Sequence, residues 1–81
     1  MDIKTITSLM QSSDYRDRMK AEYYHVQLRK TNLEAVLKLW DSNKLTFTPD
    51  CPRSIYDIQL RAMKDYMAVL ETRAKIEHVE L

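Results

Sequence analysis

Hydrophobic residues between Asp14 and Trp40 recur every three or four positions, and no proline or glycine interrupts them. This spacing places their side chains on one side of an α-helix. One apolar row consists of Tyr15, Met19, Val26, Leu33, Val36, Leu37 and Trp40, and a second consists of Tyr24, Leu28, Ala35 and Leu39. The pattern predicts a helix over residues 13–40 that needs two neighbours. Ser12 or Ser13 is suited to cap its first turn.

A second long helix is predicted over residues 53–78, where apolar residues alternate at intervals of four and three as in a coiled coil. Its main row consists of Tyr56, Leu60, Met63, Met67, Leu70 and Ala74. A second row alongside contains Ile55, Gln59, Ala62, Tyr66, Val69, Arg73 and Ile76. Pro52 fits the first turn, and Ser54 with Asp57 resembles a capping box.

Residues 41–52 form the connector between these helices, because polar residues follow Trp40 and the only two prolines, Pro49 and Pro52, lie in this segment. Residues 1–12 form an N-terminal arm or short helix, since Ile3, Ile6 and Met10 have helical spacing. The sequence therefore predicts an all-α fold. It is a single domain over residues 1–81, built as a long antiparallel helical hairpin with a short N-terminal arm or helix.

Folding the two helices back about the connector sets Trp40 against Ile55 and Tyr56. The same alignment brings Glu22 level with Arg73, and Arg29 level with Tyr66. Polar residues thus recur within an apolar seam, and their buried groups need partners. This set comprises Glu22, Arg29, Gln59, Tyr66 and Arg73, and it is either an internal network or a binding site. Arg73 is predicted to pair with Glu22, within one chain or across an interface.

Each long helix carries two adjacent apolar rows, which is more than one hairpin can bury. The chain is also short, and a domain of 81 residues hides a modest fraction of its surface. We therefore expect a homo-oligomer that shares its core between copies.

Composition further limits the fold classes, partners and cellular settings that fit this chain. The chain lacks glycine, so it is poor in the residues that make the tight turns of a β-rich fold. Its 13 basic and 12 acidic residues leave a net charge of +1, which disfavours nucleic acid and membrane surfaces as partners. No apolar stretch is long enough for a membrane span. The single cysteine, Cys51, cannot form an internal disulfide, which favours a reducing, cytosolic setting.

The sequence offers little for catalysis. A glycine-rich phosphate loop is excluded because there is no glycine, and no Ser/His/Asp or Cys/His signature is recognisable. Glu22 and His25 form one Glu-x-x-His, but a di-metal site needs further glutamates, and the second helix has Gln59 and Arg73 instead. A surface histidine is the favoured interpretation. We expect no catalytic residue, no cofactor and no metal.

Tyrosine and arginine are the residues best suited to bind a ligand here. A tyrosine ring can stack on a base, and a guanidinium can hold a phosphate with two hydrogen bonds. The candidate binding residues are Tyr23, Tyr24, Arg29, Arg53, Arg61, Tyr66 and Arg73. The alternative is that the aromatic residues, at helical spacing, form core.

The second helix contains the pattern Gln59-Leu60-x-Ala62-Met63-x-x-Tyr66-x-x-Val69-Leu70-x-x-Arg73. This pattern resembles the C-terminal signature of a family of very short tailed-phage proteins related to an open reading frame of a crAss-like phage. The resemblance covers about residues 15–76. The N-terminal arm and the Thr-Phe-Thr-Pro-Asp-Cys-Pro connector depart from the family pattern.

The resemblance implies a non-enzymatic phage accessory protein in the cytoplasm of the infected bacterial host. Small helical-hairpin phage proteins include oligomeric sponges that sequester the nucleotide signals of bacterial immunity. By that analogy, the chain is an anti-defence sponge with a nucleotide-derived small molecule between protomers. The alternative is a protein-binding inhibitor or adaptor, similar to anti-CRISPR proteins, that acts directly on a host effector. A structural role in assembly is a third possibility.

Overall fold

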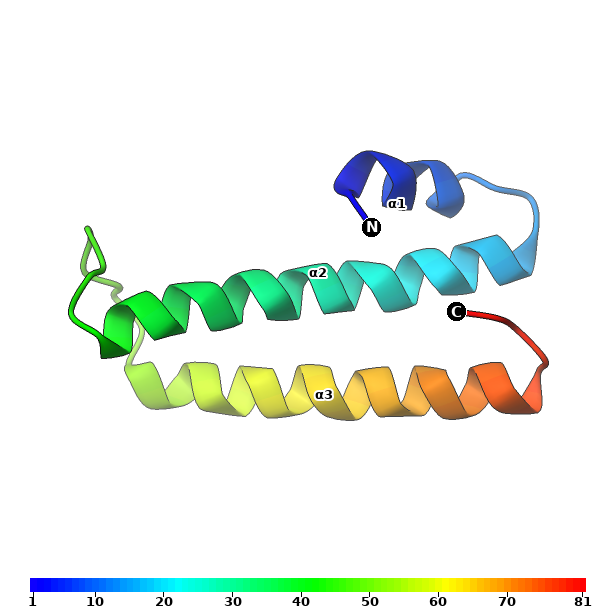
Figure 1. Ribbon diagram of the computed structural model, residues 1–81. Helices are drawn as coiled ribbons and strands as arrows, with labels where there is room; N and C mark the ends of the chain where they lie inside the picture. Colours follow the sequence, from blue (N-terminus) through cyan, green and yellow to red (C-terminus); the bar gives the residue numbers. More distant parts are fainter.

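The computed structural model covers residues 1–81 and consists of three α-helices without a strand. They are α1 (Ile3–Met10), α2 (Tyr15–Asp41) and α3 (Arg53–Ile76) (Figure 1). The predicted all-α class is confirmed. None of the three helices is both long enough and apolar enough to cross a membrane.

Helices α2 and α3 lie side by side along most of their length (Figure 1). At one end, the Tyr15 hydroxyl donates a hydrogen bond to Glu77 Oε1 over 2.8 Å. At the other end, the rings of Trp40 and Tyr56 meet edge to face with their centroids 5.7 Å apart. The start of α2 therefore lies beside the end of α3, and the expected contact between Trp40 and Tyr56 forms.

The helix ends differ from the sequence prediction in three places. Asp14, rather than Ser12 or Ser13, caps α2, and its carboxylate accepts a hydrogen bond from the Arg16 amide over 2.9 Å. Helix α3 begins after Pro52 without any side-chain cap, so the capping box expected at Ser54 does not form. It ends at Ile76 instead of residue 78, because His78 adopts a left-handed backbone with φ of 57°.

Helix α1 packs on the N-terminal half of α2 (Figure 1). Its first turn is capped by Asp2, whose carboxylate accepts a hydrogen bond from the Thr5 amide over 2.8 Å. Ile6 of α1 and Ala21 of α2 are both 0% exposed. Ala21 lies three and seven residues before Tyr24 and Leu28, so it belongs to the second apolar row. Helix α1 is therefore the second neighbour of α2 along the N-terminal part of this row.

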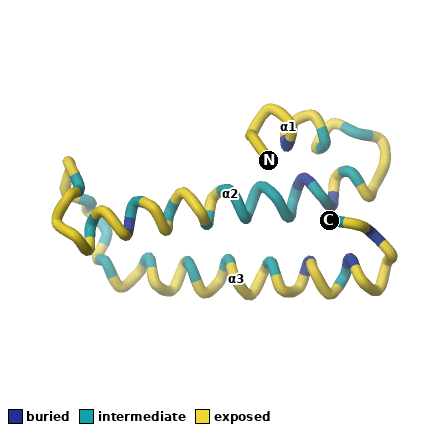
Figure 2. The backbone as a smooth tube through the Cα atoms, viewed as in Figure 1, coloured by how far each residue is buried: buried dark blue, intermediate teal, exposed yellow.

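Burial is concentrated at one end of the molecule, which measures 43 × 25 × 17 Å (Figure 2). We call this end the capped half: α1, residues 15–28 of α2, and residues 66–81. It contains six of the seven buried residues, namely Ile6, Met19, Ala21, Leu70, Ala74 and Val79. Residues 29–65, the open half, contain only Leu37. Phe47 of the connector is exposed, although it lines a shallow hollow together with Trp40.

Candidate functional site

A groove of about 460 Å³ lies between α2 and α3 near the middle of the hairpin. It is lined by His25, Val26, Arg29, Gln59, Ala62, Met63 and Tyr66. On each helix these positions are separated by intervals of one, three or four residues, which keeps their side chains on one side. The volume falls within the range of small-molecule sites, and the lining mixes apolar side chains with a few polar groups.

Arg29 supplies the positive charge of this groove. Its Nε donates a hydrogen bond to His25 Nε2 over 3.3 Å, so this imidazole nitrogen is the acceptor. Arg29 forms no ion pair with any carboxylate, in contrast to Arg53 and Arg73. Its remaining guanidinium N–H groups are therefore available to an anionic ligand, which a guanidinium can hold with two parallel hydrogen bonds.

Tyr66 supplies the aromatic ring of the groove. Its hydroxyl donates a hydrogen bond to Glu22 Oε2 across the two helices. The residue is 41% exposed, so the ring keeps accessible surface while its hydroxyl is fixed. An aromatic ring held at its outer end can serve as a platform for a flat group.

Arg73 does not pair with Glu22 within the chain, which corrects the first of the two predicted alternatives. Its Nη2 donates to the Tyr15 hydroxyl over 2.6 Å, and its Nε donates to Glu77 Oε2 over 3.3 Å. These bonds, to Tyr15 first and then to Glu77, raise the pKa of the Arg73 guanidinium. The alignment had placed Arg73 level with Glu22, but Tyr15 lies seven residues, or about two turns, before Glu22 on α2. The polar set is thus divided between the groove and the end of the hairpin.

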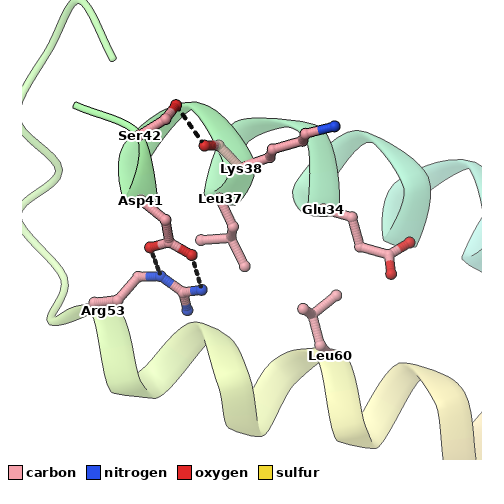
Figure 3. A pocket seen from close by; sticks show the side chains of 7 residues that line it. All are labelled: Glu34, Leu37, Lys38, Asp41, Ser42, Arg53 and Leu60. Atoms are coloured by element: carbon pink, nitrogen blue, oxygen red, sulfur yellow. Dashed lines mark hydrogen bonds and ion pairs between the residues drawn. The ribbon is translucent and has the colours of Figure 1, made fainter. Parts of the chain in front are cut away.

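Arg53 lies in a separate hollow of about 430 Å³ near the connector (Figure 3). Its Nε and Nη2 each donate to the Asp41 carboxylate over 3.0 Å, and its Nη1 donates to Asp57 Oδ1 over 2.9 Å. Hydrogen bonds to Asp41 first and then to Asp57 raise the pKa of Arg53, and the bonds between Arg53 and Asp41 lower the pKa of the Asp41 carboxyl. Two carboxylates thus occupy this guanidinium, which fastens the end of α2 to the start of α3.

The remaining candidates also lie outside the groove. The rings of Tyr23 and Tyr24 meet edge to face at 5.2 Å and an interplanar angle of 87°. Burial, followed by the charge of Glu71, raises the pKa of the Tyr23 hydroxyl. Arg61 is exposed and lines none of the hollows described here. Of the seven predicted binding residues, the structure brings Arg29 and Tyr66 together in the groove.

Sequence reasoning missed His25, which it treated as a surface histidine. His25 lies four residues before Arg29, so the two side chains are neighbours on one face of α2. That spacing was the available signal. No group of three or more His, Cys, Asp or Glu side chains is placed to hold a metal ion, and the imidazole of the Glu-x-x-His contacts Arg29.

Comparison with protein families gives a match to Sequestin over residues 13–76. The chain belongs to the Sequestin family. The Sequestin match includes α2, the connector, α3 and the whole groove, and it begins after α1. The family name indicates a protein that sequesters a molecule. No curated protein and no solved structure matches the chain.

Proposed function

We propose that this chain is a non-enzymatic phage accessory protein that sequesters a nucleotide immune signal in the cytoplasm of the infected bacterium. It acts as a homo-oligomer and holds the ligand in the groove between α2 and α3. The observation that carries this proposal is the juxtaposition of Arg29 and Tyr66 within a Sequestin fold.

The two side chains supply the two interactions that a nucleotide needs. Arg29 has no carboxylate partner, so binding a phosphate there does not require an existing ion pair to break. Tyr66 offers its ring to a base or another flat group, while Met63 and Ala62 provide apolar contacts in the same groove. Gln59 adds an amide that can donate to and accept from a base edge.

The oligomer follows from the shape of the groove. Small-molecule sites normally bury most of their ligand, yet Arg29, Gln59, Ala62 and Tyr66 are exposed in the single chain. A second protomer over the groove would supply the missing wall. The ligand would then leave intact when the protein unfolds, because sequestration forms and breaks no covalent bond in it.

The test is isothermal titration calorimetry with cyclic oligonucleotides and ADP-ribose-derived signals. Arg29→Ala should weaken binding by about tenfold or more, as expected for a charge-assisted hydrogen bond. Tyr66→Leu should weaken it by about tenfold or more through lost stacking. Tyr66→Phe keeps the ring and should therefore retain more affinity than Tyr66→Leu.

Arg61→Ala is the matched control, because it removes the same charge from an exposed position outside the groove. It should change the affinity by less than about twofold. The bound ligand should be recovered unchanged by chromatography after heating. A cleaved product would contradict the non-enzymatic proposal. Absence of heat with every ligand, together with co-purification of a host protein, would favour the inhibitor that acts directly on a host effector.

A further inference from the structure

One face of α3 carries a row of exposed apolar side chains without a partner in the chain. The row consists of Ile55, Ile58, Ala62, Val69 and Ile76, and we call it the α3 row. Four of its members are separated by seven residues, which places them nearly in one line along the helix. Ile58 and Ile76 are 64% and 72% exposed. Asp65 and Thr72 lie between members of this row, and exposed apolar side chains gathered on one helix face mark an interaction site.

The order of side chains in the α3 row fits a reversed copy of itself. Residues 55 and 76 are both isoleucine, and they lie equally far from the midpoint of the pair formed by Ala62 and Val69. In an antiparallel pair of α3 helices, Ile55 therefore faces Ile76, and the small Ala62 faces the larger Val69. A large side chain opposite a small one allows two helices to interdigitate. A two-fold axis through the midpoint makes both halves of this contact equivalent.

The area that a dimer would bury indicates how much of the hairpin the second copy must contact. From Ile55 to Ile76 the helix rises about 32 Å, and a face two helices wide measures about 20 Å. The product is about 640 Å² for each copy, or about 1,300 Å² in total, which is the size of a stable interface. A contact along α3 alone would reach about half of that. The partner must therefore also cover the groove, which shares Ala62 with the α3 row.

We propose that the α3 row is the docking surface for a second copy of this chain, which runs antiparallel and closes the groove. The near-neutral charge of +1 allows two copies to approach without strong mutual repulsion. This inference deepens the proposed function and rests on it for the role of the groove. Docking itself needs no ligand, so it is tested without one.

Light scattering of the full chain at tens of micromolar should give the mass of a dimer. Val69→Lys places a charge in the middle of the α3 row and should weaken the dimer by at least about 100-fold. The matched control is Ala68→Lys, which adds the same charge at the adjacent exposed position, about 100° around the helix. It should keep the dimer. Circular dichroism of both variants confirms that they remain helical.

Cross-linking tests the direction of docking. In a Cys51→Ser background, Ala62→Cys and Val69→Cys together should give a disulfide-linked dimer with oxidised glutathione. Within one chain these positions are two turns, about 10 Å, apart, which is too far for a disulfide. Either cysteine alone should give no cross-link, because each faces the other position in the partner.

The outcomes separate the two proposals. Cross-linking of the single variants would show parallel docking and overturn the antiparallel arrangement. A monomer mass for the unaltered chain, or loss of the dimer in both lysine variants, would overturn the docking surface. A monomer that binds the ligand would contradict the docking proposal and leave the sequestration proposal intact. A dimer that binds none of the ligands would support docking and contradict sequestration.

Discussion

The capped half and the open half contain the same two helices but differ in what covers them (Figure 2). In the capped half, α1 lies on α2, and residues 77–81 fold back so that Val79 packs with Met19 and Ala74. The open half has no third element and buries only Leu37. Two helices side by side leave most of each circumference exposed, so burial here depends on a third neighbour.

The difference separates the part of the chain that has a buried core from the part that leaves apolar side chains exposed. The capped half has its own core and can hold the hairpin together as a single chain. The open half exposes Leu39, Phe47, Ile55 and Ile58, and the groove lies where the two halves meet. A region that folds without burying its apolar residues is the natural place for a partner.

The largest expected effect on the free energy of unfolding comes from shortening a leucine of α3, and the chain offers one such leucine in each half. Leu70 is 0% exposed in the capped half, and Leu60 is half-buried in the open half. Leu70→Ala should lower the free energy of unfolding by about 2–4 kcal/mol, through lost burial and the cavity left behind. Leu60→Ala should cost about 1 kcal/mol, because less surface returns to water.

Urea unfolding at low protein concentration measures both variants in the absence of association. If Leu60→Ala lowers the free energy of unfolding as much as Leu70→Ala does, the proposed difference between the halves is contradicted. That result would mean that the open half has an equally developed core.

A second, smaller loss of stability is expected when the contact between α1 and α2 is weakened, and it tests whether α1 causes the greater burial of the capped half. Ile6 is fully buried against α2, whereas Ile3 is 51% exposed on the same short helix. Ile6→Ala should cost about 2 kcal/mol and lower the melting temperature by about 8–16 °C. Ile3→Ala is the matched control, with an expected loss of less than about 1 kcal/mol. Equal effects of the two changes would show that α1 does not cap the hairpin through Ile6.

Much of the helical framework was predictable, because it depends on local features. Apolar spacing and the lack of glycine or internal proline predict long helices wherever they persist. The contact between Trp40 and Tyr56 follows from folding back about the short connector. Arg29 and Tyr66 were placed level by the same alignment, and they share the groove.

The remaining features depend on tertiary contacts that the pattern of apolar residues does not determine. A second apolar row on α2 requires a neighbour, but the row is the same whether α1 or another copy supplies it. Polar pairing is equally undetermined: Glu22 accepts from Tyr66 instead of Arg73, and Arg53 binds Asp41 from twelve residues away. Tyr66 and Arg73 each bind a residue seven positions before the one that the alignment set level with them, so backbone alignment alone cannot select the partner.

The smallest expected effect concerns the clamp that fastens the open half, where Arg53 holds Asp41 (Figure 3). Hydrogen bonds from Arg53 lower the pKa of Asp41 below its ordinary value of 3.8. The unfolded chain therefore binds a proton more readily at this carboxyl than the folded chain does. The resulting stabilisation is fully present above pH 3.8 and is lost as the pH falls through the lower folded-state pKa.

Asp41→Asn removes this titration, so its melting temperature should lie slightly below that of the unaltered chain at pH 6. The gap should close as the pH falls below 3.8, because protonated Asp41 no longer differs in charge from asparagine. The effect is small because both side chains of the pair are partly exposed and solvent screens them. Asp50→Asn is the control, since it removes a connector carboxylate that forms no ion pair. A gap that persists at pH 2 would show that Asp41 stabilises the open half through packing rather than through its charge.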